Sequence, residues 1–336
     1  MIKEAIKKLV AGNDLTFDEA AQVMDEMFSG TATQSQMAAY LTALRIKGET
    51  IDEITASAQV MREKALHIKP NRDVLDIVGT GGDGTGTFNI STTAAFIIAA
   101  AGIPVAKHGN RSMSSKSGSA DCLEQLGINI NITPEKSEEV LNKAGICFMF
   151  AQGYHSSMKY VGPVRKEIGI RNIFNVLGPL TNPAGADLQV TGVYSEALVE
   201  PIAQVFSNLG CTKFKTVIFG IENKCVELAV VKLTHLCCCC ESNLIHAVHA
   251  VENIAFLNTE DLAGGDGKEN AEITKEILSG EIKDAKRDIV VLNAALGLCT
   301  GGKADSIQDG IKLANEIIDS GKAYAKIEEF AKASNE

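Results

Sequence analysis

The 336-residue chain lacks several features that mark common classes of protein. No apolar run reaches the length of a membrane span, and residues 1–15 lack the apolar core of a secretory signal peptide. Outside one run of consecutive cysteines, no two of the nine cysteines have the Cys-x-x-Cys spacing. An odd number of scattered cysteines is typical of reduced thiols. We therefore predict a cytoplasmic protein with no membrane partner.

Positive charge is also scarce. The formal net charge is −10, from 32 Lys and Arg residues against 42 Asp and Glu residues. Such an acidic balance argues against nucleic acid as a partner. Hydrophobic residues make up 45% of the chain, which is ample for the core of one large domain or two ordinary ones. An anionic small substrate would need a locally basic pocket within this acidic protein.

Residues 1–70 have the pattern of helices alone. Three capping boxes, each a threonine followed three positions later by Glu or Gln, begin at Thr16, Thr33 and Thr50. Apolar residues recur at helical spacing behind each cap. We predict a small all-helical domain over 1–70, which we interpret as a candidate oligomer surface.

From Val74 onward, apolar strands alternate with helices, which predicts a parallel α/β sheet. The expected strands are 74–79, 103–109, 128–130, 146–151, 188–194 and 215–220. The expected helices are 91–102, 120–126, 134–144, 198–209 and several within 269–336. Residues 153–185 are predicted to form loops with one or two short helices. The predicted class is α/β, with a mostly parallel central sheet in a larger domain over 71–336.

Residues 221–256 fit neither a strand nor a helix pattern. They contain the run Cys237–Cys240 and three of the six histidines. Four adjacent thiols cannot all face one metal because neighbouring side chains point apart, so we do not predict a zinc site here. A divergent insertion and a frame-shifted stretch of the coding sequence are the two alternatives.

The most informative stretch is 76–93, DIVGTGGDGTGTFNISTT. It joins a predicted buried strand to an apolar helix through a loop with five glycines and Asp83. Glycines let backbone N–H groups approach an anion, and the helix start adds the positive end of its dipole. The spacing matches neither the dinucleotide fingerprint nor the Walker pattern, so it predicts a phosphate site of unspecified kind. Ser91 is a candidate Mg²⁺ ligand, with capping by Asn89 or Ser91 as the alternative.

A second polar loop follows the next predicted strand. Residues 107–121 read KHGNRSMSSKSGSAD and again open a helix. Lys107 and Arg111 are suited to phosphate charge. The hydroxyls that we expect to donate hydrogen bonds are those of Ser115, Ser117 and Ser119. Two such loops on neighbouring strands predict a substrate with two separated phosphate groups, with a solvated basic loop as the alternative.

Arg165, in GPVRKEIG, lies in a setting suited to bidentate binding of a carboxylate, although a surface ion pair fits equally. No Ser-His-Asp or Cys-His order and no paired-carboxylate signature stands out. The predicted site is therefore electrostatic and has no covalent nucleophile. That suits group transfer from a sugar pyrophosphate, where the protein positions the leaving group and neutralises its charge.

These motifs closely resemble the anthranilate phosphoribosyltransferase family. The resemblance is carried by VGTGGDGTGTFNIST, KHGNRSMSSKSGSADCLEQLG, FMFAQGYHSSMKYVGPVRKEIGIRNIFNVLGPLTNPAGA and, more weakly, VVLNAALGL. It covers about residues 1–215 and 257–330. It implies that phosphoribosyl pyrophosphate (PRPP) and anthranilate are the substrates, that Mg²⁺ is the cofactor, and that the small helical domain, to which 160–185 return, forms a homodimer.

The resemblance also implies a set of site residues. The PRPP-binding residues would be Gly79, Gly82, Asp83, Thr87, Asn89, Ile90, Ser91, Thr92, Lys107, His108, Gly109, Asn110, Arg111, Ser112, Met113, Ser114, Ser115 and Ser119. Those for anthranilate would be Gly79, Asn110 and Arg165, and those for the metal Ser91 and Glu227. The implied reaction is displacement at the anomeric carbon by the neutral aromatic amine, through an oxocarbenium-like state. His108 would border the amine, and the implied reaction does not require it as a general base.

One departure from the family concerns the second metal site. The family has an Asp-Glu pair soon after the strand that matches KTVIFG, whereas this chain reads GIENKCVELAVV there. The nearest alignment inserts a residue, puts Val226 in the place of the aspartate and keeps Glu227. We expect weakened Mg²⁺-dependent turnover with phosphate binding retained.

Three other interpretations remain at this point. A pyrimidine nucleoside phosphorylase of the same superfold would have a different basic signature from KHGNR. A non-catalytic relative that binds nucleic acid would have a basic groove, which the acidic composition disfavours. An inactive copy damaged in 221–256 would still bind the pyrophosphate substrate.

Overall fold

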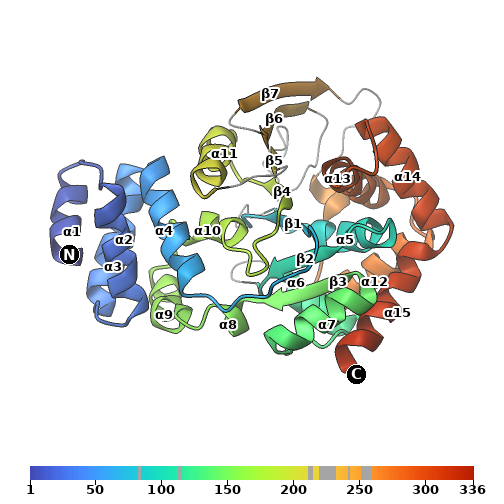
Figure 1. Cartoon of the computed structure of the whole chain (residues 1–336), viewed down its shortest axis with the longest axis horizontal. Coiled ribbons are helices and arrows are strands. Elements are labelled where there is room, and N and C mark those ends of the chain that lie inside the picture. Colours follow the sequence, from blue (N-terminus) through green and yellow to red (C-terminus); the bar gives the residue numbers. More distant parts are fainter. Residues whose placement is uncertain (82–84, 113–115, 211–214, 219–231, 241–242, 251–258) are drawn as a thin grey trace.

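The computed structural model describes residues 1–81, 85–112, 116–210, 215–218, 232–240, 243–250 and 259–336. Figure 1 shows a group of N-terminal helices on one side of a central sheet and the C-terminal helices on the other. No helix in these ranges combines the length and the apolar composition needed to span a membrane.

Four helices form the N-terminal part of the chain. They are α1 (Ile2–Val10), α2 (Phe17–Phe28), α3 (Gln34–Lys47) and α4 (Ile51–Glu63). The capping boxes at Thr16, Thr33 and Thr50 are all present, because each threonine side chain accepts a hydrogen bond from the backbone N–H three residues on. The predicted helices and their starts are confirmed.

Residues 151–180 are more helical than predicted. They form α8 (Ala151–Tyr154), α9 (Met158–Ile168) and α10 (Phe174–Leu180). The glycines and prolines there predict loops, but α9 and α10 each contain a proline and remain helical. Burial explains the difference, since Val161, Val164 and Leu177 are at most 2% exposed and belong to the same apolar cluster as α1–α4.

The central sheet has the strand order β3–β2–β1–β4–β5–β6–β7. Its strands are β1 (Leu75–Gly79), β2 (Val105–Gly109), β3 (Ile146–Phe150), β4 (Leu188–Gly192), β5 (Lys215–Ile218), β6 (Lys232–Cys240) and β7 (Asn243–Ala250). The pairs from β3 through β5 are parallel, and β6 is antiparallel to both neighbours. The predicted α/β class with a mostly parallel sheet is confirmed.

Two expectations about strands are wrong. Residues 128–130 form no strand, because the N–H of Asn129 donates to Ser334 Oγ in the C-terminal helix (3.0 Å) and not to a neighbouring strand. Conversely, 232–240 and 243–250, which fit no pattern, form the strands β6 and β7. Strands pair through hydrogen bonds between backbone groups. The unpaired edge of β5 can therefore bind β6 whatever the side-chain pattern of β6 is.

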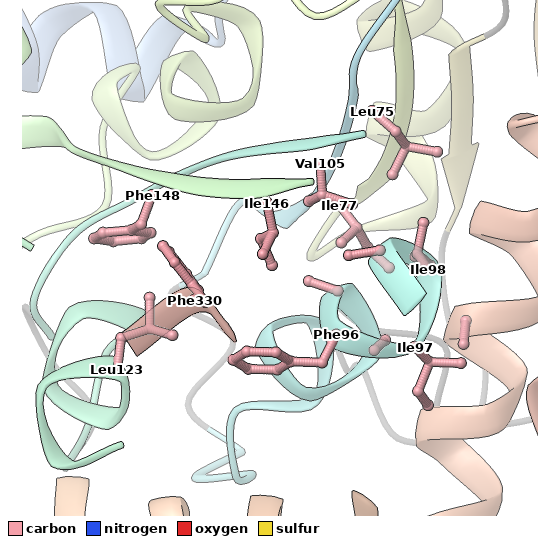
Figure 2. Packing of buried hydrophobic residues seen from close by; sticks show 14 of the residues in the cluster. Leu75, Ile77, Phe96, Ile97, Ile98, Val105, Leu123, Ile146, Phe148 and Phe330 are labelled. Carbon is pink, nitrogen blue, oxygen red and sulfur yellow. The ribbon is translucent and has the colours of Figure 1, made fainter. Parts of the chain in front are cut away.

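The remaining helices cover the sheet. They are α5 (Ile90–Ala100), α6 (Ser119–Gln125), α7 (Pro134–Ala144), α11 (Val199–Asn208), α12 (Gly267–Ser279), α13 (Ala285–Thr300), α14 (Ile307–Asp319) and α15 (Lys322–Asn335), with 3-10 turns at Glu196–Leu198 and Thr259–Leu262. Figure 2 shows Phe96 of α5 and Phe330 of α15 on the same side of the strands, with their ring centres 6.4 Å apart. This core holds the start of α5 beside the ends of β1 and β2.

Candidate active site

The predicted site residues gather at one edge of the sheet, where the chain leaves β1 and β2. Gly79 ends β1, and Lys107, His108 and Gly109 end β2. β1 and β2 are parallel neighbours, so their carboxyl ends lie at the same edge, which is where open α/β sheets bind ligands. The predicted site residues that lie outside the described ranges are Gly82, Asp83, Met113, Ser114, Ser115 and Glu227.

The start of α5 brings a second group of predicted residues to this edge. Ile90 and Thr92 are 0% and 2% exposed, so their side chains pack inside the protein. Thr87 forms an isolated backbone bridge with the C-terminal part of the chain. Ser91, in the first turn, is 9% exposed, and its Oγ lies 3.3 Å from Lys107 Nζ on β2. Ser91 therefore joins the first loop to the second.

Lys107 places a buried positive charge at this edge. Its side chain is 4% exposed, and Nζ donates to the carbonyl of Ile77 on β1 and approaches Ser91 Oγ on α5. A charge held between β1, β2 and α5 raises the electrostatic potential under both loops. This position agrees with the prediction that Lys107 meets phosphate charge.

His108 is paired with a second histidine that the sequence did not single out. The rings of His108 and His155 lie 5.0 Å apart, and both are buried. Burial, reinforced by His155 and Lys107, lowers the pKa of His108 to about 3. Burial likewise lowers the pKa of His155 to about 4. Both rings are neutral at pH 7, and within the described part of the chain Nε2 of each has no hydrogen-bond partner.

The buried carboxylate of Asp76 supports the end of β2. Its Oδ2 accepts a hydrogen bond from Asn182 Nδ2 (2.7 Å), and its Oδ1 accepts one from the backbone N–H of His108 (3.4 Å). Asn182 also donates to the carbonyl of Ala106 (2.9 Å). The pair therefore ties β1 and β2 to the loop that precedes β4. Sequence alone gave no signal for it, since Asp76 and Asn182 are 106 residues apart.

The second loop is organised by acidic residues of α6. Arg111 makes ion pairs with Asp121 (2.9 Å) and Glu124 (2.6 Å), and these carboxylates raise the pKa of its guanidinium. Asp121 also accepts hydrogen bonds from the N–H groups of Ser112 (3.2 Å) and Gly118 (2.8 Å). In the described structure the charge of Arg111 is paired with these two carboxylates, and its role toward phosphate stays a prediction.

The two predicted hydroxyl residues of this loop that the structure describes make internal contacts. Ser119 Oγ donates to the carbonyl of Asn110 (3.3 Å), and Ser117 Oγ donates to Asn89 Oδ1 (3.2 Å). The side chain of Asn110 accepts from the N–H of Arg111 (2.8 Å). The second loop is therefore bonded to itself and to the residue that precedes α5.

Arg165 lies on α9 with its guanidinium over the ring of Phe174, 5.2 Å from the ring centre. Burial lowers the pKa of Arg165, and its Nε has no hydrogen-bond partner among the described residues. Phe174 belongs to α10, whose Gly178 carbonyl lies 3.3 Å from Nδ1 of His108. The short helix α10 therefore connects Arg165 to the end of β2. Arg165 forms no ion pair with any described residue. The alternative that it serves in a surface ion pair therefore has no support within the described ranges.

The described residues offer few ligands for a metal. They contain no group of three or more His, Cys, Asp or Glu side chains placed to hold an ion. Ser91 Oγ is one hard oxygen at the start of α5, beside the loop predicted to bind phosphate. Mg²⁺ commonly takes one or two protein oxygens and completes its shell with substrate phosphates and water, so this donor fits a substrate-borne ion.

Two family models together match most of the chain. Residues 3–65 match the helical bundle domain of a glycosyl transferase family, and residues 71–324 match its a/b domain. Among curated proteins, the chain is 53% identical to the anthranilate phosphoribosyltransferase of Methanobrevibacter smithii and 51% identical to that of Ruminiclostridium cellulolyticum. The alignments cover 100% of this chain and 100% and 98% of those proteins.

Solved structures agree with these relatives. The anthranilate phosphoribosyltransferase of Thermus thermophilus is similar with a TM-score of 0.89 at 39% identity, over 99% of both chains. The Saccharomyces cerevisiae enzyme in complex with PRPP and Mg has a TM-score of 0.89 at 26% identity, over 99% of this chain and 98% of that one.

Proposed function

The chain belongs to the anthranilate phosphoribosyltransferase family, and on that premise we propose that it transfers the phosphoribosyl group of PRPP to anthranilate. The products are N-(5-phosphoribosyl)anthranilate and pyrophosphate, and the reaction is a step of tryptophan biosynthesis. One observation carries the proposal. At one end of the site lie the buried ammonium of Lys107 and a helix start. At the other end lies the half-buried guanidinium of Arg165, which has no acidic partner among the described residues.

We assign the two ends of the site to the two substrates. Lys107 and the start of α5 would face the phosphates of PRPP, and Arg165 would face the carboxylate of anthranilate. Neutral His108 lies between these ends and adds no charge near the amine. The amine displaces pyrophosphate at the anomeric carbon, so the carbon–nitrogen bond forms as the carbon–oxygen bond breaks, and the nitrogen then releases one proton to water. The protein's contribution is to position both substrates and stabilise the departing charge.

Ser91 would hold Mg²⁺ together with phosphate oxygens of the substrate. When bound, the ion would neutralise the charge of the departing pyrophosphate. The structure of the Saccharomyces cerevisiae enzyme in complex with PRPP and Mg supports this assignment. The second predicted metal residue, Glu227, lies outside the described residues, so its part in the site stays a prediction.

We propose the same two domains that the sequence predicts. The shared apolar cluster of α1–α4 with α9 and α10 supports a helical domain of 1–70 to which 160–185 return. We further propose a homodimer formed through this domain. Its support is the exposure of Val10 on α1 and Ile46 on α3, at 76% and 82%. A cytoplasmic location also stays a prediction.

The test is an assay of the purified protein with PRPP, Mg²⁺ and anthranilate, following the loss of anthranilate fluorescence. We expect loss of fluorescence that requires all three components. A protein that binds PRPP but consumes no anthranilate at any Mg²⁺ concentration would instead be the inactive copy damaged in 221–256. Phosphorolysis of a pyrimidine nucleoside would support the phosphorylase.

A further inference from the structure

Asn89 occupies the N-cap position of α5 but its side chain is used for another purpose. Asparagine at this position commonly accepts a hydrogen bond from the first turn of its own helix. Within the described residues the side chain of Asn89 makes no such bond. Its Oδ1 accepts instead from Asn270 Nδ2 (2.9 Å) and from Ser117 Oγ (3.2 Å).

The direction of these hydrogen bonds is fixed by a backbone group. The N–H of Gly265 can only donate, and it donates to Asn270 Oδ1 (2.8 Å). The nitrogen of the Asn270 amide must therefore be the atom that faces Asn89, and it donates to Asn89 Oδ1. Consequently Asn89 Nδ2 points away from α12, and no described residue accepts a hydrogen bond from it.

Asn270 is itself held rigidly. It lies in the first turn of α12 and is 1% exposed. The segment that precedes α12 is bonded to the glycine-rich loop, since the N–H of Gly264 donates to Gly86 O (2.9 Å) and that of Phe88 donates to Leu262 O (3.1 Å). A Cβ on Gly264 would lie 2.6 Å from the Cα of Phe88, so the two segments are in close backbone contact.

We propose that Asn270 is a positioning residue for substrate binding. It holds Asn89 with its Nδ2 directed to the ligand side, as a donor to a phosphate oxygen of PRPP. This inference rests on the proposed function, and it extends the site to α12, to which the sequence assigned no functional role. The ligand chemistry is a phosphate or pyrophosphate group, because a neutral amide N–H adds a directed hydrogen bond to the charge of Lys107.

The test compares Asn270→Asp and Asn270→Ala with the parent chain. In Asn270→Asp, Gly265 can still donate to one carboxylate oxygen, but the other oxygen faces Asn89 Oδ1. Asn89 is then expected to turn over and present its own oxygen to the phosphate. We expect PRPP affinity, measured by calorimetry, to fall about tenfold or more, and further in Asn270→Asp than in Asn270→Ala. The KM for anthranilate should not change.

Thr274→Val is the matched control. Thr274 lies one turn along α12, is also buried, and its Oγ1 is 2.9 Å from Thr93 Oγ1, but no hydrogen bond joins it to the side chain of Asn89. Denaturant unfolding of all three variants separates loss of stability from loss of binding. We expect Thr274→Val to be destabilised comparably and to bind PRPP like the parent.

Two results would overturn the inference. The first is that both Asn270 variants bind PRPP with the same affinity as Thr274→Val. The second is that PRPP affinity falls in proportion to the free energy of unfolding across the three variants. A parent that binds no PRPP would overturn it as well. A parent that binds PRPP but consumes no anthranilate contradicts the proposed function alone, since the binding comparison then still decides the role of Asn270.

Discussion

The guanidinium of Arg165 rests on the ring of Phe174, and no acidic partner lies within ion-pair distance among the described residues. A half-buried charge without a partner costs free energy, and a carboxylate ligand would remove that cost. We therefore expect Arg165→Ala to raise the KM for anthranilate about tenfold or more with little change in the KM for PRPP. Steady-state kinetics with each substrate varied in turn measure both.

Arg72→Ala is the control for Arg165, because Arg72 lies in the segment between α4 and β1 and donates to Leu141 O (3.4 Å). It should leave both KM values unchanged. Arg165→Lys should recover only part of the lost affinity, since an ammonium cannot reproduce a bidentate contact. An equal rise of both KM values in Arg165→Ala would show that the residue supports the fold and not the anthranilate end.

Val226 stands where the family resemblance places an aspartate, and it lies outside the described residues. A valine supplies no oxygen to a hard cation. We expect Val226→Asp to raise kcat and to lower the Mg²⁺ concentration at half-maximal rate. Val226→Asn is the matched control, because it has the shape of aspartate without its charge. A parent with a Mg²⁺ response identical to that of Val226→Asp would contradict the prediction.

At the residue scale, sequence reasoning placed a side chain well where its position follows from its own loop. Polar residues at the end of a strand and at the start of a helix predicted that Lys107 and Ser91 lie together, and the structure brings them within 3.3 Å, while their roles stay predictions. His155, Asp76 and Asn270 were missed, because their roles depend on partners brought together by the fold.

The ion pairs of Arg111 have a signal in the sequence. Asp121 and Glu124 lie three residues apart, so on a helix they share one face. Both carboxylates of this face bind Arg111. These ion pairs hold Arg111 beside the start of α6, and its role toward phosphate stays a prediction.

At the scale of elements, the loop from β2 to α6 is closed by a close backbone approach at Gly118. A Cβ there would lie 2.5 Å from Asn110 O and from Ser112 N, although the backbone of Gly118 is extended and suits any residue. We expect Gly118→Ala to displace the loop and raise the KM for PRPP at least severalfold. Calorimetry of PRPP binding checks the change directly.

Gly153→Ala is the control for Gly118, since Gly153 lies in α8, does not precede a proline, and has no atom within 4 Å of the added Cβ apart from its chain neighbours and its own helix backbone. It should bind PRPP normally and be slightly more stable, because alanine is favoured over glycine in a helix by up to about 1 kcal/mol. Normal PRPP binding by Gly118→Ala would show that the loop accommodates a methyl group.

Elements were predicted best where local signals agree. The helix 134–144 matches α7 at both ends, because Thr133 caps it, Pro134 opens it and Gly145 follows it with a positive φ. The strand expected at 128–130 is absent since the N–H of Asn129 bonds to the helix α15. The one or two short helices expected within 153–185 include α9, whose bounds the sequence did not give because tertiary burial outweighs Gly162 and Pro163. Tertiary contacts decide such cases, and a single sequence does not display them.

For the whole molecule, the buried histidine pair predicts a loss of stability in acid. The pKa of His155 in the folded protein, about 4, lies below its ordinary value, so between about pH 6.5 and 4 the unfolded chain binds a proton that the folded chain does not. Stability therefore rises with pH through this window and is lost as the pH falls. Each such histidine contributes a slope of about 1.4 kcal/mol per pH unit.

His155→Gln removes one of these groups. The free energy of unfolding of this variant, measured in urea from pH 7 to 4.5, should fall less steeply than that of the parent. His67→Gln is the comparison variant, because the ring of His67 bonds backbone carbonyls of Pro183 and Arg62 and its charge is a smaller cause of the lowered pKa of His155. It should flatten the curve less than His155→Gln does. Parallel curves for His155→Gln and the parent would show that His155 titrates alike in both states.

The proposed homodimer gives the last prediction. Val10 and Ile46 lie on α1 and α3, which pack against each other in one apolar cluster, and these side chains are 76% and 82% exposed. Single exposed apolar residues are ordinary, but burial of two on adjoining helices would stabilise association of a second copy by about 1.5–3 kcal/mol for each side chain.

We therefore expect Ile46→Glu to sediment as a monomer at concentrations where the parent is a dimer. The helix content of Ile46→Glu should equal that of the parent, and the variant should still unfold cooperatively on heating. A side chain this exposed adds little to the core of its own protomer. Leu66→Glu, at 51% exposure in the segment after α4, is the control and should leave the dimer intact. A parent that sediments as a monomer would contradict the homodimer. An Ile46→Glu variant that remains a dimer would place the dimer contact elsewhere, since an unpaired carboxylate is buried in an apolar interface only at a large cost in free energy.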